Sequence, residues 1–210
     1  MAALSGIVAV ALWIIGIAIR EALGVSDVES AQDTLAYFQD EENGILAAGF
    51  IFQIGTLFFL IFLSALRSRL WRAEGGTGML TTLAFASGVA VAIFLLALPA
   101  ADIAAALEDD LEPAAAQALL ALGNVFFLGA ELSAAVLLFA TGLLAVRLRV
   151  LPVWLGWASL VIALWLLIVP IGWAALLIGI PLWVLVTSVL IYLRPAEPAQ
   201  VETTARPPVG

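Results

Sequence analysis

Residues 151–193 read LPVWLGWASLVIALWLLIVPIGWAALLIGIPLWVLVTSVLIYL, a continuous apolar run that decides how many helices the chain forms. As a single helix, this run would be roughly 60 Å long, about twice the ~30 Å hydrocarbon core of a bilayer. Pro170, which cannot donate a helical hydrogen bond, is followed by Gly172 near the centre of the run. The run therefore predicts two transmembrane helices, 151–169 and 171–193, joined by a tight turn.

Four further apolar segments are long enough to cross a membrane, at about 4–20, 45–66, 79–99 and 117–146. The chain is 64% hydrophobic and 11% charged, with mean hydropathy +1.17, which is more apolar surface than a soluble core of this size can bury. The first segment lacks the charged start and the cleavage site of a secretory signal, so we expect it to be retained. We therefore predict an all-α, polytopic membrane bundle of six transmembrane helices, arranged as three helical hairpins, over residues 1–194.

The arginines orient this bundle, because Lys and Arg concentrate in the short cytoplasmic loops of membrane proteins. With six helices, every arginine except Arg20 falls on one side, namely Arg67, Arg69, Arg72, Arg147, Arg149, Arg194 and Arg206. A five-helix division would separate Arg149 from Arg194. The pattern therefore favours six helices with both termini in the cytoplasm, and the proline-rich residues 195–210 predict a disordered cytoplasmic tail.

Acidic residues concentrate in the two predicted outer loops. They are Glu21, Asp27, Glu29, Asp33, Asp40, Glu41 and Glu42 in the first loop, and Asp102, Glu108, Asp109, Asp110 and Glu112 in the second. In the first loop, Ser26 and Glu29 have the spacing of a capping box, and apolar side chains from Val28 to Phe38 recur at helical spacing. We predict a short amphipathic helix there, and the acidic loops are a candidate surface for a protein partner.

The charge balance and the missing residue types exclude several functions. A formal charge of -8, with eight Arg and no Lys, argues against nucleic-acid binding, which needs a basic surface. The lack of Cys and His removes disulfides, thiolate catalysis and the usual zinc and haem ligands, and the lack of Lys removes Schiff-base chemistry. Serine catalysis would have no His or Lys base. We therefore expect no enzymatic activity, no cofactor and no metal.

A weak internal similarity links the starts of two predicted helices. LAAGFIFQIG at 46–55 and LALGNVFFLG at 120–129 match at Leu46/Leu120, Ala47/Ala121, Gly49/Gly123, Phe52/Phe126 and Gly55/Gly129. Each copy follows an acidic loop and runs in the same direction. This similarity is either a duplicated hairpin of the parallel kind or chance in a biased composition.

Loose motifs occur along the chain, namely AYF at 36–38, SALRSRL at 64–70, RAEGGTG at 72–78 and PVWLGWASL at 152–160. In this organisation, over residues 1–194, the chain resembles small six-helix integral membrane proteins of unknown function from high-GC bacteria. The resemblance implies a bacterial cytoplasmic membrane. It implies no established activity and carries no functional residues over to this chain.

A single acidic residue, Glu131, lies near the middle of a predicted span. It is 16 residues from Arg147, or roughly 24 Å along a helix, which places its carboxyl group within the hydrocarbon zone. An ionised carboxylate is unfavourable there, so we expect Glu131 to be protonated or paired and to face protein or water. Gln117, Asn124 and Glu131 recur every seven residues and so form one polar stripe.

Three residues on other predicted helices are candidate partners of Glu131. Gln53 lies at a comparable depth, about 21 Å from Arg67, and Thr56 follows on the same helix face. Arg20 has a side chain long enough either to extend outward or to reach down to the carboxylate. Our candidate intramembrane polar site therefore consists of Glu131, Asn124, Gln117, Gln53, Thr56 and Arg20.

Two functions remain open from the sequence. In the first, the chain is a non-enzymatic accessory or scaffold protein, and Glu131 is a structural clamp between helices. In the second, it is a small proton- or cation-linked transporter, and Glu131 is the titrating site.

Overall fold

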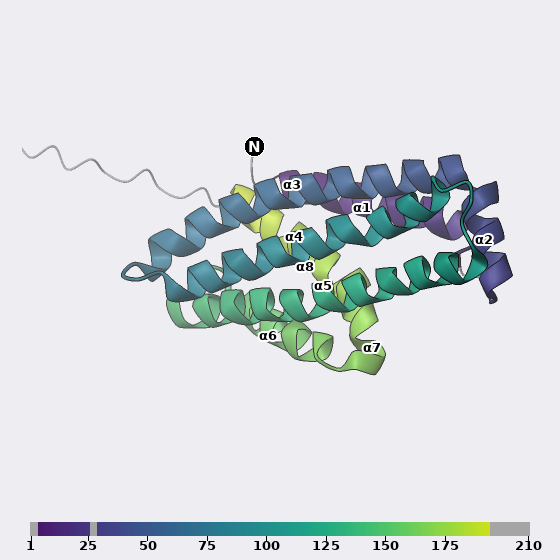
Figure 1. Cartoon of the computed structure of the whole chain (residues 1–210). Coiled ribbons are helices and arrows are strands. Elements are labelled where there is room, and N and C mark those ends of the chain that lie inside the picture. The colour runs from purple at the N-terminus through teal and green to yellow at the C-terminus, as the bar shows by residue number, and fades with distance from the viewer. Residues whose placement is uncertain (1–3, 26–28, 194–210) are drawn as a thin grey trace, which may run out of the picture.

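The computed structural model describes residues 4–25 and 29–193, and every regular element in these residues is helical. The long helices are α1 (Ser5–Ala22), α3 (Glu42–Glu74), α4 (Met79–Ala106) and α5 (Pro113–Leu148). They pack side by side and alternate in direction along the chain (Figure 1). The predicted all-α class is therefore confirmed. We call the end of the bundle with the 75–78 loop the arginine end, and the opposite end the α2 end.

Five helical segments are long and apolar enough to cross a membrane, namely α1, α3, α4, α5 and Ile171–Leu193. The helix between them in sequence, α6 (Val153–Leu166), has 14 residues and is roughly 21 Å long. That length is less than the ~30 Å hydrocarbon core. The structure thus contains five segments of spanning length and one shorter apolar helix.

The predicted division of 151–193 into two helical segments is confirmed. The chain turns at Leu167 and Ile168 and continues through α7 (Val169–Ala174), the π-helical turn η2 (Ala175–Gly179) and α8 (Ile180–Leu193). The turn comes before Pro170 because proline fits in the first turn of α7, where its missing N–H is not needed.

The π-helical turn has a similar cause. Pro181 has no N–H to donate to the carbonyl group of residue 177, and the N–H of Ile180 instead bonds to the carbonyl oxygen of Ala175, five residues back.

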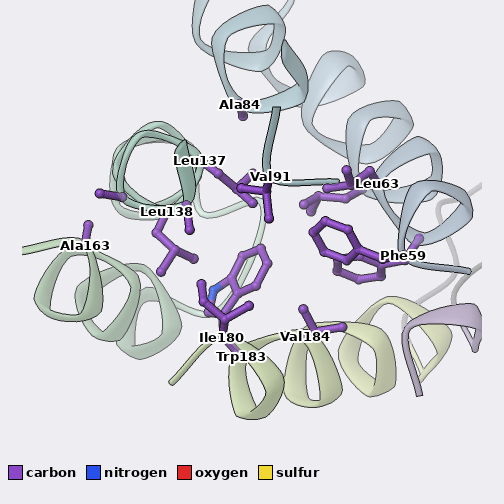
Figure 2. Close-up of a cluster of buried hydrophobic side chains, with 14 of the residues drawn as sticks. Phe59, Leu63, Ala84, Val91, Leu137, Leu138, Ala163, Ile180, Trp183 and Val184 are labelled. Atoms are coloured by element: carbon purple, nitrogen blue, oxygen red, sulfur yellow. The ribbon is translucent and has the colours of Figure 1, made fainter. Parts of the chain in front are cut away.

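Helix α8 supplies the centre of the hydrophobic core. The indole of Trp183 lies among side chains of α3, α4, α5 and α6, including Phe59, Val91, Leu138 and Ala163 (Figure 2). Its Nε1 atom donates to Ser159 Oγ at 2.8 Å, so the buried indole N–H is satisfied. This contact ties α8 to α6.

Small residues bring α1 and α3 into close contact. A Cβ atom at Gly55 would lie 3.0 Å from the Ala9 carbonyl oxygen, so only glycine permits this approach. Beside it, Trp13 Nε1 on α1 donates to Thr56 Oγ1 on α3 at 3.0 Å. Thr56 is therefore part of a helix clamp within the core.

Helix α2 (Ala31–Asp40) lies across one end of the bundle (Figure 1). The predicted amphipathic helix is confirmed, since Thr34, Tyr37 and Phe38 are buried and the opposite side is exposed. Its start was wrongly predicted, because the capping box joins Ser30 and Asp33. The expected capping residue Ser26 lies outside the described residues, as do Val28 and the expected tail at 195–210.

Candidate ligand cavity

A cavity of about 390 Å³ lies in the half of the bundle nearest α2. It exists because the α6–α7 turn does not reach that end. Gly172 of α7 packs against the Glu131 carboxyl group. A Cβ atom added to Gly172 would lie only 3.2 Å from Glu131 Oε1. Glu131 is 18 residues, or roughly 27 Å, from Pro113, where α5 begins. Figure 1 shows that α6 and α7 stop short of the end of the bundle where α2 lies, whereas α3 and α5 continue to that end.

The floor and walls of the cavity are apolar and aromatic. Helices α1, α3, α4 and α5 contribute the walls, and α7, η2 and the start of α8 contribute the floor. Side chains that line it include Trp13, Phe52, Leu95, Phe127, Trp173, Leu176 and Ile180. Its volume and lining are typical of small-molecule pockets, which occupy roughly 300–1,000 Å³ and are mostly apolar.

The cavity opens between α1 and α5. The exposed residues of its lining are Glu21 on α1, Asn124 on α5, Trp173 on α7 and Leu177 in η2. Helices α1 and α5 have little or no contact with each other over the described residues, whereas α1 packs on α3 and α5 packs on α4. The opening therefore lies on the side of the bundle, above α7 and below α2.

An ion pair forms part of the polar rim. Arg20 Nε donates to Asp102 Oδ2 at 3.0 Å, and the side chains are 33% and 6% exposed. The Arg20 guanidinium has no other partner among the residues that the structure describes. Its terminal N–H groups thus remain available as donors at the cavity.

The position of Asp102 corrects the sequence prediction, which placed it in an outer loop. Helix α4 continues through Pro99 as far as Ala106, so Asp102 lies inside the helix and is buried. The backbone next to the proline is supported by Gln53, whose Nε2 donates to the Leu96 carbonyl oxygen at 3.1 Å. Gln53 therefore stabilises the proline-containing part of α4.

Tyr37 of α2 completes the rim. Its side chain is 6% exposed and lines the cavity, yet its hydroxyl group has no hydrogen-bond partner among the described residues. Burial raises the pKa of Tyr37 to about 12, so the hydroxyl stays protonated at physiological pH. Unpaired buried hydroxyl groups are unusual in proteins, because they lose their hydrogen bonds to water.

The six residues predicted as one polar site are not brought together. Arg20 and Asn124 line the cavity, and Gln117 is exposed on α5. Gln53 and Thr56 bond to Leu96 and Trp13 as described, and neither bonds to Glu131. Arg20 turns to Asp102 instead of reaching Glu131.

Glu131 lies outside the cavity lining, next to the α6–α7 turn. It is 4% exposed, and its carboxyl group has no hydrogen bond or ion pair among the described residues. A Cβ atom added to Gly172 would also lie 3.0 Å from the carbonyl oxygen of Leu166, so this carbonyl and the Glu131 carboxyl group face the same side of Gly172. That carbonyl lacks a helical donor, because the residue four positions later is Pro170.

The functional residues that sequence reasoning missed are Asp102 and Tyr37. A signal for Asp102 existed, since it stands alone within an alanine-rich run, apart from the cluster at 108–112. Tyr37 belonged to the predicted amphipathic helix, but no sequence pattern indicates an unpaired hydroxyl. No group of acidic side chains with the arrangement of a metal site occurs in the described part of the chain.

Comparisons with known proteins found no relative of this chain. The chain matches no model of a protein family, no curated protein and no solved structure.

Proposed function

We propose that this chain is a non-enzymatic, six-span protein of a bacterial cell membrane that binds a small amphiphilic molecule in the cavity at its α2 end. The observation that carries the proposal is the cavity itself, with an apolar floor and a rim formed by Arg20, Asp102 and Tyr37. A molecule with an apolar tail and a polar head would match both parts. An accessory role, in which the occupied cavity or the acidic end influences a partner, is consistent with this activity.

The charge distribution supports an orientation with the α2 end outside. Arg67, Arg72 and Arg147 all lie near the arginine end, and exposed acidic residues of α2 and of the 107–112 loop lie at the other. Under the positive-inside rule the arginine end is cytoplasmic. Helix α6 with α7–α8 then forms a hairpin that starts and finishes on the cytoplasmic side.

Cysteine labelling tests this orientation, because the native chain has no cysteine. A cysteine at Asp109 should react with a membrane-impermeant thiol reagent on intact cells, and one at Gly75 should react only after lysis. Both positions are exposed. The opposite labelling pattern would refute the orientation.

Depth within the membrane supports the choice of an amphiphile. Phe52, on the cavity wall, is about 22 Å along α3 from Arg67, which places it in the outer half of the hydrocarbon core. The rim residues lie nearer the outer end of the bundle, at the depth of lipid headgroups. The opening between α1 and α5 would then face the outer leaflet.

A cavity-filling variant tests the proposal. Gly123 lines the cavity, and a Cβ atom there would meet no other atom within 4 Å. Gly123→Trp should fill the cavity without a clash and abolish saturable binding of a fluorescent single-chain amphiphile. Ala121→Trp, on the exposed side of α5, is the matched control. Equal binding by Gly123→Trp and the parent would refute the proposal.

A second function, proton- or cation-linked transport with Glu131 as the titrating site, has one observation in its favour. Glu131 is buried and unpartnered among the described residues, and such a carboxyl group within a membrane is a candidate for function. Against it, Glu131 does not line the cavity. If Glu131→Gln in reconstituted vesicles takes up protons or cations as the parent does, this alternative is refuted.

A further inference from the structure

The rim of the cavity contains groups that select the head of the bound molecule, and this inference rests on the proposed function. Among the described residues, the Arg20 guanidinium has N–H groups without a partner, and Tyr37, which also lines the cavity, has a buried hydroxyl without a partner. Both are hydrogen-bond donors, and Arg20 is also a cation. Phosphate or carboxylate oxygens are the acceptors that such donors prefer.

The remaining charges of the rim are negative. Asp102 forms an ion pair with Arg20. Glu21, which follows Arg20 on α1, is exposed and also lines the cavity. The charged side chains that line the cavity are therefore one positive, Arg20, and two negative, Asp102 and Glu21. A head that is only anionic would meet net repulsion, and a head that is only cationic would leave the donors of Arg20 and Tyr37 unused.

We propose that the cavity binds an acyl chain whose headgroup is zwitterionic, with an anionic phosphate against Arg20 and Tyr37 and an ammonium group toward Glu21. The phosphate oxygens supply the acceptor that the Tyr37 hydroxyl lacks. The ammonium group is placed among carboxylates, which restores the local charge balance. The acyl chain occupies the apolar floor.

The shape of the site also indicates how the chain enters. The opening lies on the side of the bundle between α1 and α5, so a tail enters from the bilayer while its head stays at the rim. A volume of about 390 Å³ is near the lower end of the range for ligand pockets and suits a single chain. The ligand is therefore either a lysophospholipid or a phospholipid with one of its two chains inserted.

A headgroup series tests the proposal on the full-length protein in detergent. The probes share one acyl chain and differ in the head: lysophosphatidylethanolamine, lysophosphatidylglycerol and monoacylglycerol. We expect the zwitterionic probe to bind roughly tenfold more tightly than the other two, because it alone engages both the donors and Glu21. Equal affinity for all three, or preference for the glycerol heads, overturns the headgroup proposal.

Two conservative variants separate the two contacts. Tyr37→Phe removes only a hydroxyl that has no protein partner, so the fold should be unaffected and the phosphate probes should bind roughly tenfold more weakly, with monoacylglycerol unchanged. Glu21→Gln should erase the preference for the ethanolamine head. Unchanged affinities in Tyr37→Phe refute the phosphate contact, and an unchanged preference in Glu21→Gln refutes the ammonium contact.

The Gly123→Trp variant distinguishes a failed headgroup proposal from a failed function. If all heads bind equally to the parent and none binds to Gly123→Trp, the cavity binds amphiphiles without headgroup selection. If no probe binds the parent, both proposals fail. Mass spectrometry of protein released from nanodiscs of phosphatidylethanolamine and phosphatidylglycerol then identifies the source, since a retained diacyl lipid and a retained lysolipid differ in mass.

Discussion

Replacement of Arg20 by methionine would leave the Asp102 carboxyl group buried without its counter-ion. Asp102 is 4% exposed, and its only partner among the described residues is Arg20 Nε at 3.0 Å. Removal of one member of a buried pair destabilises proteins by about 3–5 kcal/mol. Arg20 is one third exposed, so solvent screening reduces this value, and we expect about 2–3 kcal/mol for Arg20→Met.

The reverse substitution should cost less. In Asp102→Asn the buried residue becomes neutral, and the partly exposed guanidinium of Arg20 can extend toward solvent at the cavity mouth. We expect a loss of about 1 kcal/mol or less, in the range of a neutral hydrogen bond. The double variant Arg20→Met/Asp102→Asn should therefore be more stable than Arg20→Met alone.

Unfolding in mixed micelles, followed by tryptophan fluorescence, gives the free energy of unfolding for the four proteins of this double-mutant cycle. The asymmetry between the single variants is the decisive quantity. A larger loss for Asp102→Asn than for Arg20→Met, or no coupling between the substitutions, would show that the pair is solvated and would refute the reasoning.

Three further predictions concern other polar groups. Glu131→Gln should retain the free energy of unfolding of the parent, because the amide keeps the shape of the side chain and is a hydrogen-bond donor beside the turn carbonyl, whereas Glu131→Leu puts an apolar group beside that carbonyl and should lose about 1–2 kcal/mol in the same assay. Thr56→Val should lose about 1–2 kcal/mol, since it leaves the buried N–H of Trp13 unpaired, and Thr56→Ser should restore stability. The side-chain hydrogen bond from Ser30 lowers the pKa of Asp33, so the cap of α2 contributes above the ordinary pKa of 3.8 and is lost as the pH falls through the lowered pKa. At pH 7, hydrogen exchange in α2 should accordingly be faster in Ser30→Ala than in the parent. This difference should disappear as the pH falls through the lowered pKa, after correction for intrinsic rates, and equal protection of the two proteins at pH 7 would refute the cap.

The helices were predictable because hydropathy and length identify them without knowledge of their neighbours. The turn in 151–193 followed from Pro170 in the same way, although its position shifted to Leu167 and Ile168. The length of α6 was not predictable, because apolar residues continue through the turn and give no sign that the helix stops near the middle of α5. The cavity depends on that length, so the sequence alone could not indicate it.

The polar site was mispredicted for a different reason. The distance of a residue along its helix shows which residues of other helices lie at the same depth. It does not give the direction in which each side chain points. Arg20 and Asp102 pair at the α2 end, and Asp102 was assigned to a loop because the predicted span ended at residue 99, whereas α4 continues through Pro99 to Ala106. A proline within a membrane helix is tolerated where neighbouring helices pack around it, and Gln53 of α3 bonds to the Leu96 carbonyl oxygen, next to the Leu95 carbonyl that Pro99 leaves without its helical donor.

One structural feature, the short α6, relates the position of Glu131 to that of the cavity rim. Because α6 ends below the level of the rim, the turn into α7 lies against α5, and Glu131 is the polar side chain beside the unsupported carbonyl of Leu166. Above the turn, the cavity is bordered by Arg20, which pairs with Asp102, and by the buried side chain of Tyr37. Glu131 thus relates to the folding of the hairpin and the rim relates to the ligand, which is why Glu131→Leu should lower stability through the turn and leave headgroup preference unchanged.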